Sequence, residues 1–92
     1  VGILEAGSEF HERSRRNESV LLEEVLRFGG RLGGRSVREA RFPAHSTLVT
    51  IRRAESVIIP NGATVLHPGD TVVVLTTRRN ADQVKRWLQE HC

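Results

Sequence analysis

Residue types that build covalent or metal-held frameworks are scarce in this 92-residue sequence. Its single cysteine is Cys92, so the chain can form neither an internal disulfide framework nor a cysteine cage for zinc. No apolar run approaches the roughly 20 residues that a membrane-spanning helix needs, and no signal peptide opens the sequence. We therefore expect one small domain with its own core, in a reducing cytoplasm and without direct insertion into a membrane.

Positive charge is in slight excess and is carried almost wholly by arginine. Fourteen basic and eleven acidic residues give a net charge of +3, and Lys85 is the single lysine. This bias reflects either genome base composition or a surface for phosphates, which the planar guanidinium binds through two hydrogen bonds. Arg52-Arg53 and Arg78-Arg79 follow β-branched runs, either as an anion-binding edge or as solvated strand ends. Because aromatic residues do not interleave with these pairs, we expect no nucleic-acid partner.

The chain divides into two parts of different pattern. Residues 1–18 are polar with little periodicity, and we predict that they are a partly flexible linker. The run Gly7-Ser8-Glu9-Phe10 also looks like a cloning-site scar, so this segment is a linker or is derived from cloning. Residues 19–92 carry the apolar runs and turn signals of a folded domain.

The pattern of residues 19–92 predicts a small α+β domain with a mostly antiparallel sheet, a short helix and a C-terminal amphipathic helix. Ser36-x-x-Glu39 is a capping box, and Pro43 ends the helix that follows it. Apolar spacing over residues 20–28 favours a helix, with a strand as the alternative. The other expected elements are a short helix at 37–41, strands at 47–53, 57–59, 63–66 and 71–77, and a last helix after residue 80.

The last strand and the last helix have the clearest signals. The centre of residues 71–77 is an unbroken apolar run, which predicts a strand buried on both faces. Asn80 is the expected N-cap of the last helix. The apolar stripe of that helix consists of Val84, Trp87, Leu88 and His91.

The sequence contains no recognisable catalytic or metal-binding pattern. Its histidines lack the spacing of a metal site and lie at His11, His45, His67 and His91. The run Gly29-Gly-Arg-Leu-Gly-Gly34 fails the G-x-G-x-x-G spacing and lacks the lysine of a P-loop, so it reads as a flexible turn. We therefore expect no enzymatic activity and no bound metal.

Four short motifs follow one another in the order and spacing of a known family. They are Leu32-Gly-Gly34-Arg-Ser36-Val37, Thr50-Ile51-Arg52-Arg53, Val57-Ile-Ile-Pro60-Asn-Gly62 and Val65-Leu-His-Pro-Gly-Asp70-Thr-Val-Val-Val. With these motifs the chain resembles the TrkA-C (RCK-C) regulatory domain. That domain is attached on the cytoplasmic side to bacterial potassium uptake systems, potassium channels, antiporters, some chloride channels and some anion symporters. The family fold makes residues 20–28 its first strand, and we adopt that prediction over the helical one.

The resemblance implies a sensor without catalytic activity. Two copies would form a homodimer, bind a small anionic ligand in the cleft between them, and change geometry on binding. A membrane-embedded transporter or channel, of the same or a partner chain, would respond on the cytoplasmic side of the cell membrane. NAD or ATP binding is not implied, because the Rossmann domain of whole regulatory subunits is absent from this sequence. The alternatives are a structural dimerisation module that binds nothing and, third, a nucleic-acid-binding module.

The same resemblance names candidate ligand residues. In some relatives from Gram-positive bacteria the ligand is cyclic di-AMP, contacted by the segment that corresponds to residues 41–48. Arg41 matches their arginine as a phosphate partner, and Leu48 matches an apolar residue that packs on a base. Thr47 stands where they carry an asparagine, and Pro43 departs from their pattern. The candidate residues for a cyclic dinucleotide or other small anionic ligand are Arg41, Thr47, Leu48 and Arg53.

Overall fold

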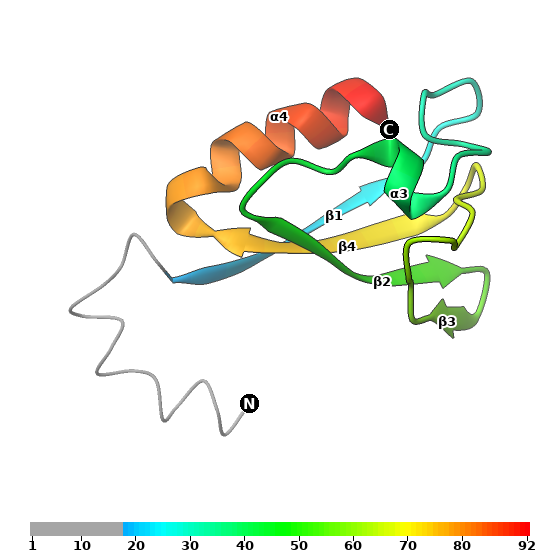
Figure 1. Ribbon diagram of the computed structural model, residues 1–92, viewed down its shortest axis with the longest axis horizontal. Helices are drawn as coiled ribbons and strands as arrows, with labels where there is room; N and C mark the ends of the chain where they lie inside the picture. Colours follow the sequence, from blue (N-terminus) through cyan, green and yellow to red (C-terminus); the bar gives the residue numbers. More distant parts are fainter. Residues whose placement is uncertain (1–17) are drawn as a thin grey trace.

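A four-stranded antiparallel sheet forms the centre of the computed structural model, which describes residues 18–92 (Figure 1). The strand order is β1-β4-β2-β3, so the last strand of the chain lies inside the sheet. The α+β fold with an antiparallel sheet is therefore confirmed. The predictions for residues 1–17 lie outside the described part. The elements are β1 (Ser19–Val25), α3 (Val37–Ala40), β2 (Ser46–Arg53), β3 (Ser56–Ile58), β4 (Thr71–Thr77), the 3-10 turn η2 (Arg78–Asn80) and α4 (Ala81–His91).

The first element is a strand, as the family resemblance predicts, and the helical prediction from apolar spacing is wrong. Side chains of β1 alternate between exposed and half-buried along its whole length. Leu22 lies opposite Val74 of β4 and packs against the core, whereas Leu21 lies opposite Leu75 on the other face. Both faces of this strand carry leucine and valine, and that is why its apolar residues imitate a helical spacing.

The central strand is β4, and its apolar run is buried as predicted. Val72 and Val74 are fully buried on the face that meets the helices, and Val73 is 6% exposed on the opposite face. Leu75 departs from the prediction, because it is 37% exposed on that opposite face. A strand paired on both sides presents continuous apolar residues when both of its faces have neighbours.

One face of the sheet carries the helices and most of the core (Figure 1). Val84 and Leu88 of α4 are fully buried there, and Trp87 and His91 are half-buried, so the predicted stripe is confirmed. The predicted cap is wrong: Asn80 makes no capping bond, and its Nδ2 donates instead to Thr77 Oγ1 at 2.8 Å. The 3-10 turn before α4 already directs the chain into the helix and takes the place of a cap.

The short helix α3 begins with the predicted capping box. Glu39 N–H donates to Ser36 Oγ at 3.2 Å, and Ser36 N–H donates to Glu39 Oε1 at 2.9 Å. The strand expected at residues 63–66 is wrong, because only one isolated bridge forms, between Ser36 and Val65. Immediately after Ser36 the chain enters α3, so the bridge cannot extend into a ladder of strand pairs.

Cys92 is packed behind the end of α4. It is 2% exposed, and its carbonyl oxygen accepts a hydrogen bond from Arg27 N–H at 3.0 Å. Gly30 passes so close that a Cβ there would collide with this same carbonyl oxygen. Burial raises the pKa of the Cys92 thiol to about 11.

A buried ion pair joins the end of β2 to the turn before β4. Arg53 donates to Asp70 through Nε at 2.9 Å and through Nη2 at 2.8 Å, and Nη2 also donates to the Val65 carbonyl at 3.0 Å. Asp70 is 1% exposed and also accepts from His67 N–H at 2.9 Å, which closes the turn before β4. Burial disfavours the Asp70 carboxylate, but the bonds from Arg53 and His67 outweigh it and lower its pKa. The bond to Asp70 likewise raises the pKa of Arg53.

We expect Asp70→Asn to destabilise the protein by about 2–3 kcal/mol, because it leaves Arg53 without its charged partner in a largely enclosed place. Chemical denaturation followed by circular dichroism measures this change. Glu23→Gln is the matched control, because it removes the exposed Arg52–Glu23 pair, whose partners are about half exposed. That loss should stay under about 1 kcal/mol. Equal losses in the two variants would contradict a special role for Asp70.

The contribution of Asp70 should disappear in acid. Its pKa is lower in the folded protein than the ordinary value of 3.8, so its stabilisation is complete above that value and is lost as the pH falls through the folded pKa. The difference in unfolding free energy between wild type and Asp70→Asn should therefore shrink at low pH. A difference that stays constant from neutral pH into acid would show that the carboxylate charge is not the cause.

A candidate ligand site on and beside the second strand

Arg41 lies immediately after α3 and has a left-handed backbone, with φ of 53° and ψ of 62°. His45, at the other end of the connection to β2, also has a positive φ of 67°. Such a conformation costs a residue other than glycine about 1 kcal/mol or more. The Arg41 side chain is exposed and forms no ion pair or hydrogen bond with residues 18–92. It is therefore free to meet an anion from outside.

Thr47 and Leu48 are neighbours on β2 and face opposite sides of the sheet. Thr47 lies opposite Leu75 on the face without helices and is exposed. Leu48 lies opposite Val74, is half-buried and packs against the core. Of the two, only Thr47 is presented on the uncovered face.

Arg53 is at the far end of β2 from Thr47, in the ion pair with Asp70 described above. Nε and Nη2 of Arg53 are already engaged, which leaves Nη1 as its remaining donor. None of the four candidate side chains hydrogen-bonds to another within the described part of the chain. One protomer thus does not bring the four side chains together: Thr47 and Leu48 lie on opposite faces of β2, and Arg41 and Arg53 lie on either side of them along the chain.

The face of the sheet opposite the helices, here called the open face, exposes several large apolar side chains among polar ones. Antiparallel sheets with one solvated face ordinarily carry polar side chains there. Arg52 of β2 forms an ion pair with Glu23 of β1 at 2.7 Å, and the two side chains meet over β4. Val73 of β4, which pairs with residues of both neighbouring strands, lies between β1 and β2. The exposed apolar residues of the open face are Leu21 (60%), Val25 (53%), Val49 (40%), Val57 (64%) and Leu75 (37%).

The two arginine pairs that were candidates for an anion-binding edge are mostly engaged in ion pairs. Arg52 and Arg53 bind Glu23 and Asp70, and Arg78 Nη2 binds Glu18 Oε2 at 2.6 Å. Arg79 is exposed. Three of the four guanidiniums are therefore held by carboxylates of this chain and do not form a common edge for anions.

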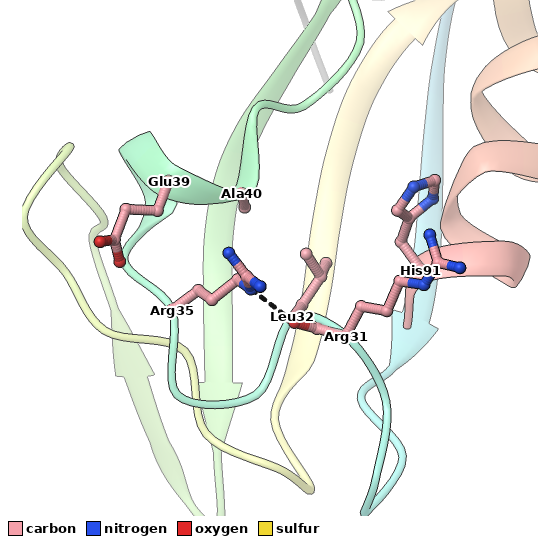
Figure 2. Close-up of a pocket in the computed structure, with 6 residues that line it drawn as sticks. All are labelled: Arg31, Leu32, Arg35, Glu39, Ala40 and His91. Atoms are coloured by element: carbon pink, nitrogen blue, oxygen red, sulfur yellow. Dashed lines mark hydrogen bonds between the residues drawn. The ribbon is translucent and has the colours of Figure 1, made fainter.

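A pocket of about 150 Å³ lies between the loop before α3, α3 itself and the end of α4. Figure 2 shows Arg35 in its middle, with Glu39 on one side and Arg31 and His91 on the other. Sequence spacing did not point to this group, because the loop and the last turn of α4 are far apart in the chain. The residues that line the pocket are Arg31, Leu32, Arg35, Glu39, Ala40 and His91.

Other site classes find no support in the part that the structure describes. Residues 18–92 contain no cluster of three or more histidine, cysteine, aspartate or glutamate side chains that could hold a metal ion. Within the same residues, every helix is too short or too polar to cross a bilayer.

Solved structures of similar fold come from channels and from ligand-bound domains. The chain is 28% identical to an RCK domain with cda, covering 74% of this chain and 96% of that one, with a TM-score of 0.60. The RCK_C domain dimer of S. agalactiae BusR in complex with c-di-AMP is 18% identical, with coverages of 75% and 95% and a TM-score of 0.61. The GsuK channel bound to NAD is 15% identical, with a TM-score of 0.66. The match covers 95% of this chain but only 17% of the GsuK chain.

The expectation that nucleic acid is not a partner is not confirmed by these neighbours. BusR is also known in complex with its busAB-promoter DNA, where it is 15% identical and covers 96% of this chain and 46% of that one, with a TM-score of 0.61. A search of curated protein sequences matched none of them.

The family assignment rests on the sequence itself as well as on the fold. The family model of the TrkA-C domain matches residues 21–89, which is three-quarters of the chain. These are the residues of the sheet, both helices and the turns between them. The chain belongs to the TrkA-C domain family.

Proposed function

We propose that this chain is the regulatory, ligand-sensing domain of a bacterial ion transport protein that moves potassium, another cation or chloride. The observation that carries the proposal is the TrkA-C match over residues 21–89. The domain would work without catalysis on the cytoplasmic side of the membrane, coupled to a membrane-embedded transporter or channel of the same or a partner chain. Its ligand would act by binding two geometries of the domain with unequal affinity.

The active form in this proposal is a homodimer that buries the open face. That face exposes five large apolar side chains on all four strands, and a second copy of the chain would cover them with the same residues. The dimeric RCK_C domain of BusR supports this choice of partner. The Arg52–Glu23 ion pair on the same face would help to fix how the two copies align.

The ligand in this proposal is a small anion, with cyclic di-AMP as the first compound to test, as the ligands of the two domain-sized neighbours suggest. Arg41 would bind a phosphate, because its guanidinium has no partner among residues 18–92. Thr47 would contact the ligand from the open face at the dimer boundary. Leu48 would contribute its half-exposed edge, and Arg53 its free Nη1.

Leu21→Glu should weaken the dimer at least about tenfold, since it places two like charges in the apolar centre of the proposed interface. Sedimentation equilibrium measures the dissociation constant. Gln83→Glu is the control and should leave the dimer unchanged, because it adds the same charge at an exposed position of α4, on the other side of the sheet. If both variants remain as dimeric as the wild type, the open face is not the interface.

Arg41→Ala should weaken the ligand by about 1.5–3 kcal/mol, the loss of one charge-assisted contact. Alanine also has a Cβ, so the left-handed backbone at this position is equally strained in the variant and the comparison isolates the guanidinium. Isothermal titration calorimetry with cyclic di-AMP measures the affinity, and Arg79→Ala is the exposed control. Unchanged affinity in Arg41→Ala would remove this residue from the site.

A structural dimerisation module is the second candidate, because the apolar open face would by itself explain assembly. A thermal-shift panel of cyclic dinucleotides, adenine nucleotides, simple anions and a short DNA duplex separates the alternatives. A ligand at a hundred times its dissociation constant stabilises the fold by about 2.7 kcal/mol. A flat panel on a tight dimer would favour the structural role, and a shift with the duplex alone would favour nucleic-acid binding.

A further inference from the structure

We propose that the pocket between the 31–35 loop, α3 and the end of α4 binds a small phosphate-type oxyanion. This site differs from the proposed ligand site at Arg41 and Thr47 and does not depend on it. Its lining comes from three segments of one protomer, so it is complete without a second copy. The size suits a single oxyanion, since its volume of about 150 Å³ is well below the roughly 300–1,000 Å³ of pockets for drug-sized ligands.

Arg35 is oriented in the pocket before any ligand arrives. Its Nε donates to the Arg31 carbonyl oxygen at 3.0 Å, which fixes the direction of the guanidinium. Both of its terminal nitrogens have no hydrogen-bond partner among residues 18–92. Figure 2 shows this guanidinium between the loop and Ala40. A fixed guanidinium with two free donors is preorganised for two hydrogen bonds to one oxyanion.

The charges of the lining favour an anion over a cation. Neither Arg31 nor Arg35 forms an ion pair with any described residue. Glu39 is the one acidic residue in the lining, and its Oε1 already accepts from Ser36 N–H at 2.9 Å. This backbone bond is the main cause of its lowered pKa, so the Glu39 carboxylate serves the start of α3. Two arginines thus face one carboxylate that is already engaged.

The remaining walls are apolar or aromatic. Leu32 is 2% exposed and Ala40 is 8% exposed, so they form an apolar floor of the pocket. His91 stacks on Trp87 at 4.3 Å, and its Nδ1 lies 2.8 Å from the Trp87 carbonyl oxygen. These contacts hold the imidazole at the edge of the pocket. The walls are therefore fixed by packing and not by a flexible loop alone.

Inorganic phosphate titrated into the purified protein, with thermal denaturation as the readout, tests the proposal. We expect saturable stabilisation at millimolar phosphate that sodium chloride of equal ionic strength does not reproduce. Arg35→Gln and Arg31→Gln should each weaken phosphate about tenfold or more. Arg79→Gln, which removes an exposed arginine elsewhere, and Arg41→Ala should leave it unchanged. A parallel titration with phenyl phosphate shows whether a phosphate ester binds as well as the free ion.

Three results would overturn the proposal: no saturable rise in melting temperature with phosphate, an equal rise with sodium chloride, or an equal loss of phosphate affinity in Arg79→Gln. Arg35→Gln also removes the bond to the Arg31 carbonyl oxygen, so it can affect folding. Arg31→Gln guards against this ambiguity, because the Arg31 side chain makes no hydrogen bond with residues 18–92. Arg41→Ala separates the two sites, because it should weaken cyclic dinucleotide binding while the affinity of the pocket for phosphate remains.

Discussion

The ion pair between Arg53 and Asp70 closes one end of the sheet and attaches the 65–70 loop to it. Arg53 is the last residue of β2, and Asp70 immediately precedes β4. The Asp70 carboxylate accepts hydrogen bonds from Arg53 and from His67 N–H. The backbone of Asp70 adds a third connection, because its carbonyl oxygen accepts from Leu26 N–H at 2.8 Å just after β1. Asp70 therefore connects the ends of β1 and β2 to the start of β4, through its backbone carbonyl and its carboxylate respectively. A buried charge of this kind is costly unless fully bonded, as it is here.

The two faces of the sheet have different physical roles. On one face, Leu88 of α4 and Ala40 of α3 join Leu26 and Val74 in a small core. On the other, no element of residues 18–92 covers the exposed apolar side chains. A domain of this size buries a comparatively small fraction of its surface when it folds. An apolar face left exposed to water would therefore lower its stability and favour aggregation. The proposed association of two copies would cover this face and would place Thr47 beside the boundary between them.

Local rules predicted the parts whose signals are local, and failed where distant segments decide. The capping box at Ser36 and the buried run of β4 depend on adjacent residues, and both were found. The turn between β2 and β3 was not foreseen, because Ala54 has a φ of 54° where glycine or asparagine would be the usual signal. Strand 63–66 failed because its only bridge, to Ser36, lies at the start of α3, and the cap at Asn80 failed because its side chain bonds Thr77 across the 3-10 turn. The pocket at Arg35 could not be seen at all, since His91 reaches it only through the packing of α4.

The burial of Cys92 has a practical consequence for following motions of the domain. A thiol that stays protonated at neutral pH and is shielded from solvent reacts slowly with alkylating reagents. Its modification therefore requires the last turn of α4 to separate from the loop at Gly30. Because the chain has a single cysteine, the rate of labelling reads out this one local opening. The native sequence thus carries a built-in probe beside the arginine-lined pocket, and it needs no engineered label.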